Sequence, residues 1–244
     1  MDTRPTRRRR RQRPCRQNYS HVEPDVTVTL CILAGGRSRR FGSSKLRVQF
    51  VEHETGQRHW LLTHQASRLG SALGCSRRWL SVSPTNPAPP GYLAYRRRIV
   101  DERRDIGPLA GMAAVLAHAG PHDTVAFVPA DMPLVDPAYL RQLIRAAERT
   151  DRSPIAMGRW AGGPRCGVVE PFPCACCGVN AFDLIRRAMR AGVRAPLTMA
   201  RWRGVRTLPL GWPRDCAVFI NFNRVNDLTT VRSHLGDRWD IQEA

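Results

Sequence analysis

The feature that most constrains the fold of this chain is the alternation of buried-strand patterns with helical spacing. Residues 26–33, 79–82 and 124–129 are short, β-branched or apolar runs typical of buried strands. Helical apolar spacing occurs around 60–69, 108–119 and 137–149, and Pro108 and Pro137 suit a first helical turn. This order predicts an α/β fold with a mainly parallel sheet and helices on both faces.

The remainder of the chain continues the pattern less regularly. We expect strands at 165–170 and 217–221, and helices at 180–191, 196–203 and 225–235. Residues 1–24 lack apolar periodicity and carry an arginine run, which predicts a disordered arm before a single domain at 25–244. Ligands of such sheets bind beyond the carboxyl ends of the strands, so the turns after Leu33 and Pro129 are the expected site.

Charge and hydropathy narrow the class of protein. The 244 residues carry a formal net charge of +19, almost entirely from arginine, which raises the local concentration of polyanions without choosing among them. No apolar run reaches the roughly 18 residues of a membrane-spanning helix. The arginine-rich start is not followed by a signal-peptide pattern, so we expect a cytoplasmic protein without membrane contact.

The strongest chemical signal is the loop at residues 33–45, LAGGRSRRFGSSK. A strand feeding a glycine-rich loop with several cationic side chains is typical of a phosphate cradle, because glycine lets exposed N–H groups approach an anion. The spacing fits neither the dinucleotide fingerprint nor the Walker loop. Lys45 is the only lysine in a chain that otherwise uses arginine, which indicates a specific need for an ammonium group there.

This loop resembles the signature of the molybdenum cofactor guanylyltransferases (MobA type), written L-A-G-G-x-x-x-R-M-G-x-x-K. The matching residues are Leu33, Ala34, Gly35, Gly36, Arg40, Gly42 and Lys45, with Phe41 in place of methionine. The resemblance implies a Rossmann-like nucleotidyltransferase fold and a GTP site that includes Leu33 to Gly36 and Lys45. It divides the domain into a nucleotide half at about 25–135 and a pterin-facing half at about 136–244.

A second stretch, residues 100–116, is similar to the family's acidic residue followed by G-P-L-A-G at a helix start. The resemblance assigns Asp101 to the guanine nucleotide, and Asp105 is the competing candidate. Gly107, Pro108 and Gly111 fit a tight helix entry that lets a base or ribose approach the backbone.

A third stretch, FVPADMPLVDP at 127–137, places Asp131 just past an apolar strand and is similar to the family's A-D-M-P element. A carboxylate there can bind Mg²⁺ together with phosphate oxygens and water. Asp136 is the better candidate for a helix cap, so we interpret Asp131 as the metal ligand.

The resemblance extends to the C-terminus, with departures. Residues 221–228, NFNRVNDL, match the family's N-x-N-T-P-E-D-L, which places Asn221 and Asn223 on the pterin side. Gly163 stands before Pro164 where the family has histidine, and the run CACC predicts a longer connection before 180–191. Ser83 and Asn86 are both candidates for the family's asparagine after the second strand.

The function implied is transfer of GMP from GTP to the terminal phosphate of molybdopterin, with Lys45, Asp131 and Arg40 as catalytic residues and Mg²⁺ as cofactor. GTP and molybdopterin are the implied partners, and a molybdoenzyme or cofactor chaperone is a further candidate. One alternative is a cytidylyltransferase making the cytosine dinucleotide, which usually carries L-A-A-G. Another is a nucleic-acid-binding protein using the basic arm, but the core shows no interleaved aromatic platform, so we expect only non-specific arm contacts.

The cysteines allow one further reading. Cys174, Cys176 and Cys177 are close in sequence, and Cys166 could complete four zinc ligands. The chain lacks paired C-x₂-C knuckles, and we favour unpaired thiols over zinc ligands or a disulfide framework.

Overall fold

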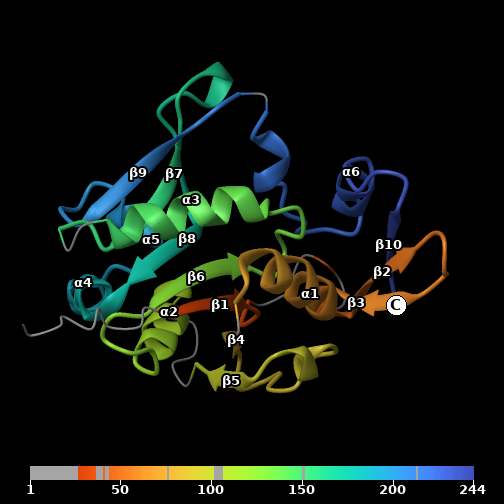
Figure 1. Ribbon diagram of the computed structural model, residues 1–244, viewed down its shortest axis with the longest axis horizontal. Coiled ribbons are helices and arrows are strands. Elements are labelled where there is room, and N and C mark those ends of the chain that lie inside the picture. Colours follow the sequence, from red (N-terminus) through yellow and green to blue (C-terminus); the bar gives the residue numbers. More distant parts are fainter. Residues whose placement is uncertain are drawn as a thin grey trace, which may run out of the picture.

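The sheet at the centre of the molecule has the strand order β5-β4-β1-β6-β8-β7-β9 (Figure 1). This computed structural model describes residues 27–36, 41, 44–75, 77–101, 107–149, 152–212 and 214–244. The predicted arm at 1–24, Arg40, Gly42 and Asp105 lie outside these residues. The seven strands are β1 (Val28–Leu33), β4 (Arg77–Val82), β5 (Arg97–Val100), β6 (Thr124–Pro129), β7 (Ile155–Trp160), β8 (Val169–Cys177) and β9 (Val205–Leu210).

The sheet is mainly parallel, as the alternation predicted. Strands β5, β4, β1 and β6 pair in parallel, β8 runs antiparallel to both β6 and β7, and β9 pairs in parallel with β7. The confirmed α/β class therefore includes one reversed strand, β8, which lies between β6 and β7 in the sheet.

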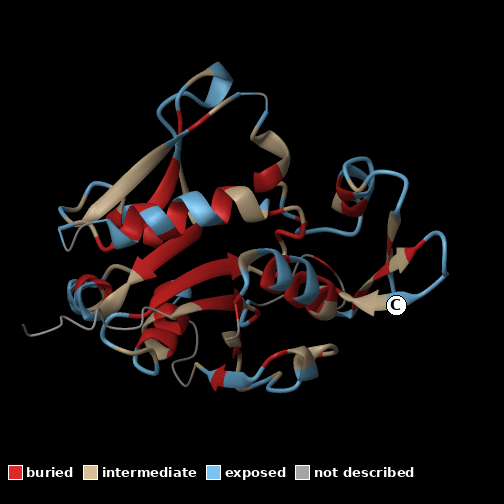
Figure 2. Cartoon of the chain, in the orientation of Figure 1, coloured by how far each residue is buried: buried red, intermediate tan, exposed pale blue. Residues whose placement is uncertain are grey.

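Helices cover both faces of this sheet. Leu30 and Ile32 of β1 pack into one buried cluster with α1 (Leu61–Leu73) and α3 (Pro137–Glu148). Cys31 packs into the other cluster with α2 (Pro108–Leu116) and α4 (Gly178–Arg190). Because both faces are covered, β1 and β6 are almost wholly buried (Figure 2), and this explains their continuous apolar sequences.

A second sheet of three antiparallel strands joins distant parts of the chain. Its order is β10 (Trp239–Glu243), β2 (Val48–Glu52) and β3 (Arg58–Trp60), with α6 (Asp227–Arg232) beside it (Figure 1). Arg238 donates to Glu52 at 2.8 Å, and this bond ties the C-terminal strand to the segment after Lys45. The C-terminal segment therefore stabilises the region that follows the glycine-rich loop.

Several predicted elements differ from the structure. Residues 217–221 are not a strand, because Cys216–Phe219 forms a 3-10 helix, η4, whose Phe219 packs against Tyr139 and Trp160. The helix expected at 196–203 is only α5 (Pro196–Met199), since the chain turns at Gly204 to enter β9. The strand expected at 165–170 begins at Val169, after a 3-10 helix at Gly163–Arg165.

The cysteine-rich run is also corrected by the structure. Cys174 and Cys176 belong to β8 and are fully buried, so this run is the end of a core strand and not a lengthened connection. Burial raises the pKa of the Cys176 thiol well above its ordinary value, which disfavours the thiolate form that binds zinc. Within the described residues, no three His, Cys, Asp or Glu side chains are grouped as metal ligands.

No helix in the described part of the chain is both long enough and apolar enough to cross a lipid bilayer.

Candidate active site

The register of the parallel strands brings the predicted residues to one edge of the sheet. Leu33 of β1 lies opposite Ser81 of β4 and Pro129 of β6, and Val82 lies opposite Val100 of β5. The segments that follow these strands therefore emerge together beyond their carboxyl ends. A cavity of about 930 Å³ opens there, where open α/β sheets bind their ligands.

Most of the predicted site lines this cavity. The lining includes the predicted residues Leu33, Ala34, Gly35, Gly36, Lys45, Asp101, Asp131 and Asn221. Asn223 lies beside it, in contact with Lys45. Arg40 falls outside the described residues.

The turn after β1 is fixed by its neighbours. The N–H of Ala34 donates to the carbonyl of Ser81 at 2.8 Å, and Ala130 donates to the carbonyl of Leu33 at 3.0 Å. These bonds extend the pairing of β1 past its end on both sides. Gly35 and Gly36 follow on the cavity wall, and a Cβ on Gly36 would meet no atom within 4 Å. The backbone at Gly36 is therefore open to close approach by a ligand.

An ion pair occupies the middle of the cavity edge. Lys45 Nζ lies 2.6 Å from Asp131 Oδ2, and the two side chains are only 12% and 20% exposed. The same Nζ donates to Asn223 Oδ1 at 3.3 Å. Partial burial strengthens this pair relative to an exposed one, because water screens it less. Asp131 and Asn223, which come from two separate motifs, thus converge on the positive charge of Lys45.

The loop at 221–223 is held in place from both sides. The N–H of Phe222 donates to the carbonyl of Asp131 at 3.1 Å, and the buried ring of Phe222 packs against Phe41 at 5.8 Å. Asp227 accepts hydrogen bonds from the N–H groups of Asn223 and Arg224 at 2.7 and 2.9 Å. The motif at 221–228 therefore positions Asn223 against Lys45.

Asp101 and the start of α2 form the other end of the cavity. The N–H of Asp101 donates to the carbonyl of Val82 at 3.0 Å, which continues the β4–β5 pairing. Gly107 has a φ of +91°, and a Cβ there would lie 2.7 Å from the carbonyl oxygen of Arg194. Only glycine suits this position, and it brings the N-terminus of α2 to the cavity wall.

Sequence reasoning missed part of the lining. Ser81 and Thr85 lie near the end of β4, and Glu170, Pro171, Phe172 and Phe219 line the side formed by β8 and η4. Of the two candidates after the second strand, Ser83 lines the cavity and contacts Thr85 at 2.8 Å, whereas Asn86 is not among the described lining residues. Pro164 lies in the 3-10 helix before β8, and the cavity is lined instead by Pro171.

Comparison with known proteins identifies relatives of this chain. A molybdenum cofactor guanylyltransferase of Xanthomonas euvesicatoria pv. vesicatoria is 32% identical over 117 residues, 48% of this chain and 53% of that protein. The protein of that name from Pseudomonas aeruginosa is 32% identical over 178 residues, 71% of this chain and 81% of its own length. The matched segments thus span from about half to four fifths of these relatives.

Solved structures show the same fold. The molybdopterin-guanine dinucleotide biosynthesis protein A of Archaeoglobus fulgidus superposes with a TM-score of 0.63 at 22% identity, covering 84% of this chain and 97% of that one. The family model described as the MobA-like NTP transferase domain matches residues 30–234, which include the described site residues. Because this match covers most of the chain, the protein belongs to the MobA-like NTP transferase family of nucleotidyltransferases.

Proposed function

We propose that this chain transfers GMP from GTP to the terminal phosphate of molybdopterin, giving the guanine dinucleotide cofactor and pyrophosphate. The observation that supports this most is the convergence of Lys45, Asp131 and Asn223 inside one cavity at the carboxyl edge of the sheet. The relatives from Xanthomonas and Pseudomonas are named molybdenum cofactor guanylyltransferases, and both match this chain at 32% identity.

The proposed reaction is an in-line displacement at phosphorus. An oxygen of the acceptor phosphate forms a bond to the α-phosphorus of GTP, the bond from that phosphorus to the α–β bridging oxygen breaks, and pyrophosphate leaves. No covalent bond to the protein is required, so catalysis rests on positioning and on neutralising phosphate charge. In this proposal Lys45 and the 34–43 backbone amides hold the triphosphate, Asp101 and the turn at 33–36 hold the nucleoside, and Arg40 contacts the departing pyrophosphate.

The residues around Lys45 fit a divalent cation. Asp131 Oδ2 and Asn223 Oδ1 already gather around one positive charge, the Lys45 ammonium. Carboxylate and amide oxygens are the ligands that Mg²⁺ takes in proteins, with phosphate oxygens and water completing its shell. Bound Mg²⁺ would supply charge stabilisation near the α-phosphate. In this proposal Asp131 is the protein carboxylate that would hold Mg²⁺. Asn223 would lie beside Asp131 and, together with Asn221, on the side of the pterin acceptor.

Guanine is favoured over cytosine by the turn after β1. The cytidylyl-transferring relatives usually carry L-A-A-G, which would place alanine at position 35, and this chain has Gly35. A Cβ on Gly35 would lie 3.6 Å from the Ser83 nitrogen, an ordinary van der Waals distance. An alanine at position 35 would therefore fit the fold, and its methyl group would reduce the space in the cavity beside the turn. A cytoplasmic location and a molybdoenzyme or chaperone partner stay predictions.

We expect GTP with Mg²⁺ to bind more tightly than CTP or ATP, as measured by titration calorimetry on the full chain. Gly35→Ala is the matched variant, since its added methyl is expected to weaken GTP binding more than CTP binding while the fold is retained. Equal or tighter CTP binding by the wild type would remove the guanine assignment and favour the cytosine dinucleotide.

A further inference from the structure

A third carboxylate lines the cavity, on the side that the sequence motifs did not identify. Glu170 of β8 lines the cavity together with Pro171 and Phe172, and Phe219 of η4 lies on the same side. Its side chain is 14% exposed, so it is largely withdrawn from water. A carboxylate in such a place needs a partner or a ligand, because burying an unpaired charge is costly.

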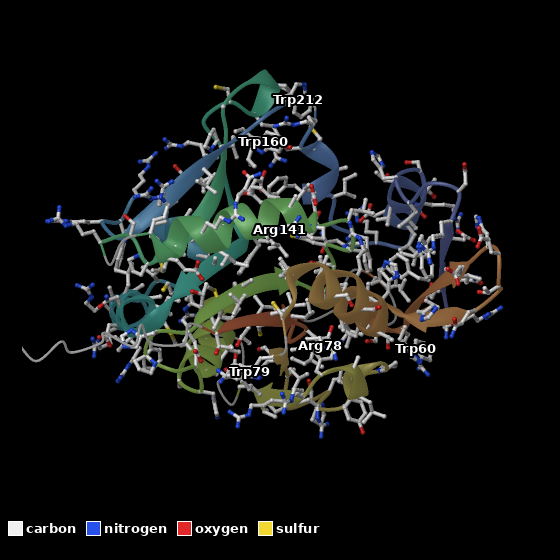
Figure 3. All side chains as sticks on the ribbon, viewed as in Figure 1. Trp60, Arg78, Trp79, Arg141, Trp160 and Trp212 are labelled. Carbon is white, nitrogen blue, oxygen red and sulfur yellow. The ribbon has the colours of Figure 1, made fainter. Side chains whose placement is uncertain are left out.

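Two donors fix the orientation of Glu170. Trp160 Nε1 donates to Oε1 at 2.8 Å, and the Arg165 guanidinium contacts the same oxygen at 2.6 Å. Trp160 is itself buried and packs edge-on against Trp212 at 5.8 Å and Phe219 at 5.4 Å, and Figure 3 shows Trp160 and Trp212 side by side. The donor that holds the Glu170 carboxylate, Trp160 Nε1, is therefore itself fixed by its packing against other aromatic rings.

Part of the acceptor capacity of Glu170 remains for a ligand. A carboxylate has about four acceptor positions on its two oxygens. Among the described residues, both donors to Glu170 reach Oε1 and none reaches Oε2. An acceptor of this kind, next to the apolar surfaces of Phe172 and Phe219, suits a flat heterocycle with N–H groups along one edge.

Asp101 and Glu170, the outer two of the three carboxylates that line the cavity, belong to parts of the sheet that are well separated. Asp101 follows β5, and Glu170 lies on β8, four positions along the order β5-β4-β1-β6-β8. With a strand spacing of about 4.8 Å, the two strands are about 19 Å apart across the sheet. Asp131 follows β6, between them. The cavity thus has a carboxylate toward each end and the Lys45–Asp131 pair between the ends.

Guanine and pterin present the same hydrogen-bonding edge. Each has a 2-amino-4-oxo pyrimidine ring, in which a ring N–H stands beside an exocyclic amino group, and a carboxylate can accept from such donors. We propose that Glu170 recognises this edge of the pterin acceptor, at the end of the cavity opposite to Asp101, which is assigned to the guanine nucleotide. This inference rests on the proposed function and makes Glu170 a specificity-determining residue for the acceptor.

The test measures binding of 6-hydroxymethylpterin and 6-hydroxymethyllumazine to the full chain by ligand fluorescence. Lumazine has an oxygen in place of the 2-amino group, so it presents an acceptor to the carboxylate. Since hydrogen bonds to charged groups are the strong ones, we expect the wild type to prefer the pterin by about 10-fold or more. Glu170→Gln should remove this preference and leave GTP affinity unchanged.

Two variants separate recognition from structure. Arg165→Gln removes the ion pair but keeps the carboxylate, so the pterin preference should persist; its loss to the same extent as in Glu170→Gln would overturn the inference. Asp101→Asn should weaken GTP binding and leave pterin binding intact.

Equal binding of pterin and lumazine by the wild type, a result that needs no variant, would also overturn the inference. Normal dinucleotide synthesis by Glu170→Gln would contradict this inference alone, whereas pterin selectivity without any GTP-dependent synthesis would contradict the proposed function.

Discussion

Replacing Asp131 by asparagine is expected to lower turnover by about a hundredfold or more, because metal-centred charge stabilisation supplies several kcal/mol and each 1.4 kcal/mol is about tenfold in rate. Asn keeps the shape of the side chain and one of its oxygens, but it removes the negative charge 2.6 Å from Lys45. The backbone carbonyl of residue 131 still accepts from Phe222, so the 221–223 loop should stay in place. Steady-state kinetics over a range of Mg²⁺ concentrations measures the effect.

Asp136→Asn is the matched control for this change. Asp136 caps α3 by accepting from the N–H of Ala138 at 2.8 Å, and asparagine caps helices about as well. Asp136 is not among the described residues that line the cavity. Near-normal turnover is therefore expected for this variant. If Asp131→Asn also retained near-normal turnover at limiting Mg²⁺, the carboxylate would have a structural role only.

Lys45→Arg should lower turnover by about two orders of magnitude while reducing GTP affinity less, since part of the binding survives without in-line geometry. The Lys45 ammonium fits between Asp131 Oδ2 at 2.6 Å and Asn223 Oδ1 at 3.3 Å, and it is only 12% exposed. A guanidinium is planar, bulkier and directional, so it would move one of these partners or the bound phosphates. Comparison of turnover with calorimetric GTP affinity measures the difference.

The control is Arg47→Lys, the reverse exchange two residues away in the same 3-10 helix. Arg47 is exposed, so turnover and GTP affinity should match the wild type. Wild-type turnover in Lys45→Arg, together with a mild effect of Lys45→Ala, would show that the single lysine has no phosphate role.

The central part of the fold could be predicted because its signals are local. Strands β1 and β6 are buried on both faces, so their sequences are continuous apolar runs. Helices α2 and α3 begin at Pro108 and Pro137, where proline marks a first turn. The carboxyl edge of the parallel strands then followed from the order of these elements, and with it the position of Asp131. Asp101 was found only through the family resemblance, because β5 before it was not predicted.

The elements that were not predicted correctly depend on partners that are far away in the sequence. Strand β2 pairs with β10, so Val48 and Glu243 meet across almost the whole chain, and neither segment has a strong local pattern. The run at 216–219 is apolar enough for a strand, but Phe219 fills the space between Tyr139 and Trp160 as a 3-10 turn. Tertiary packing decided both cases.

The candidate site likewise contains residues that the sequence predicted and residues that it did not. Lys45, Asp131 and Asn223 were found through motifs, although their mutual contact depends on the Phe222 bond to Asp131 and on the Asp227 cap. Glu170 has no comparable signal, since a single glutamate before a proline is unremarkable in sequence. Its place in the cavity depends on the antiparallel insertion of β8 beside β6, which the alternation of elements did not predict.

The most direct test of the proposed function is to supply the full chain with molybdopterin, Mg²⁺ and equal concentrations of GTP and CTP, and to identify the dinucleotide formed by mass spectrometry. The account predicts the guanine dinucleotide with one pyrophosphate released for each molecule formed, and little of the cytosine product. Predominant formation of the cytosine dinucleotide, or consumption of neither nucleotide by a folded protein that binds both substrates, would contradict it.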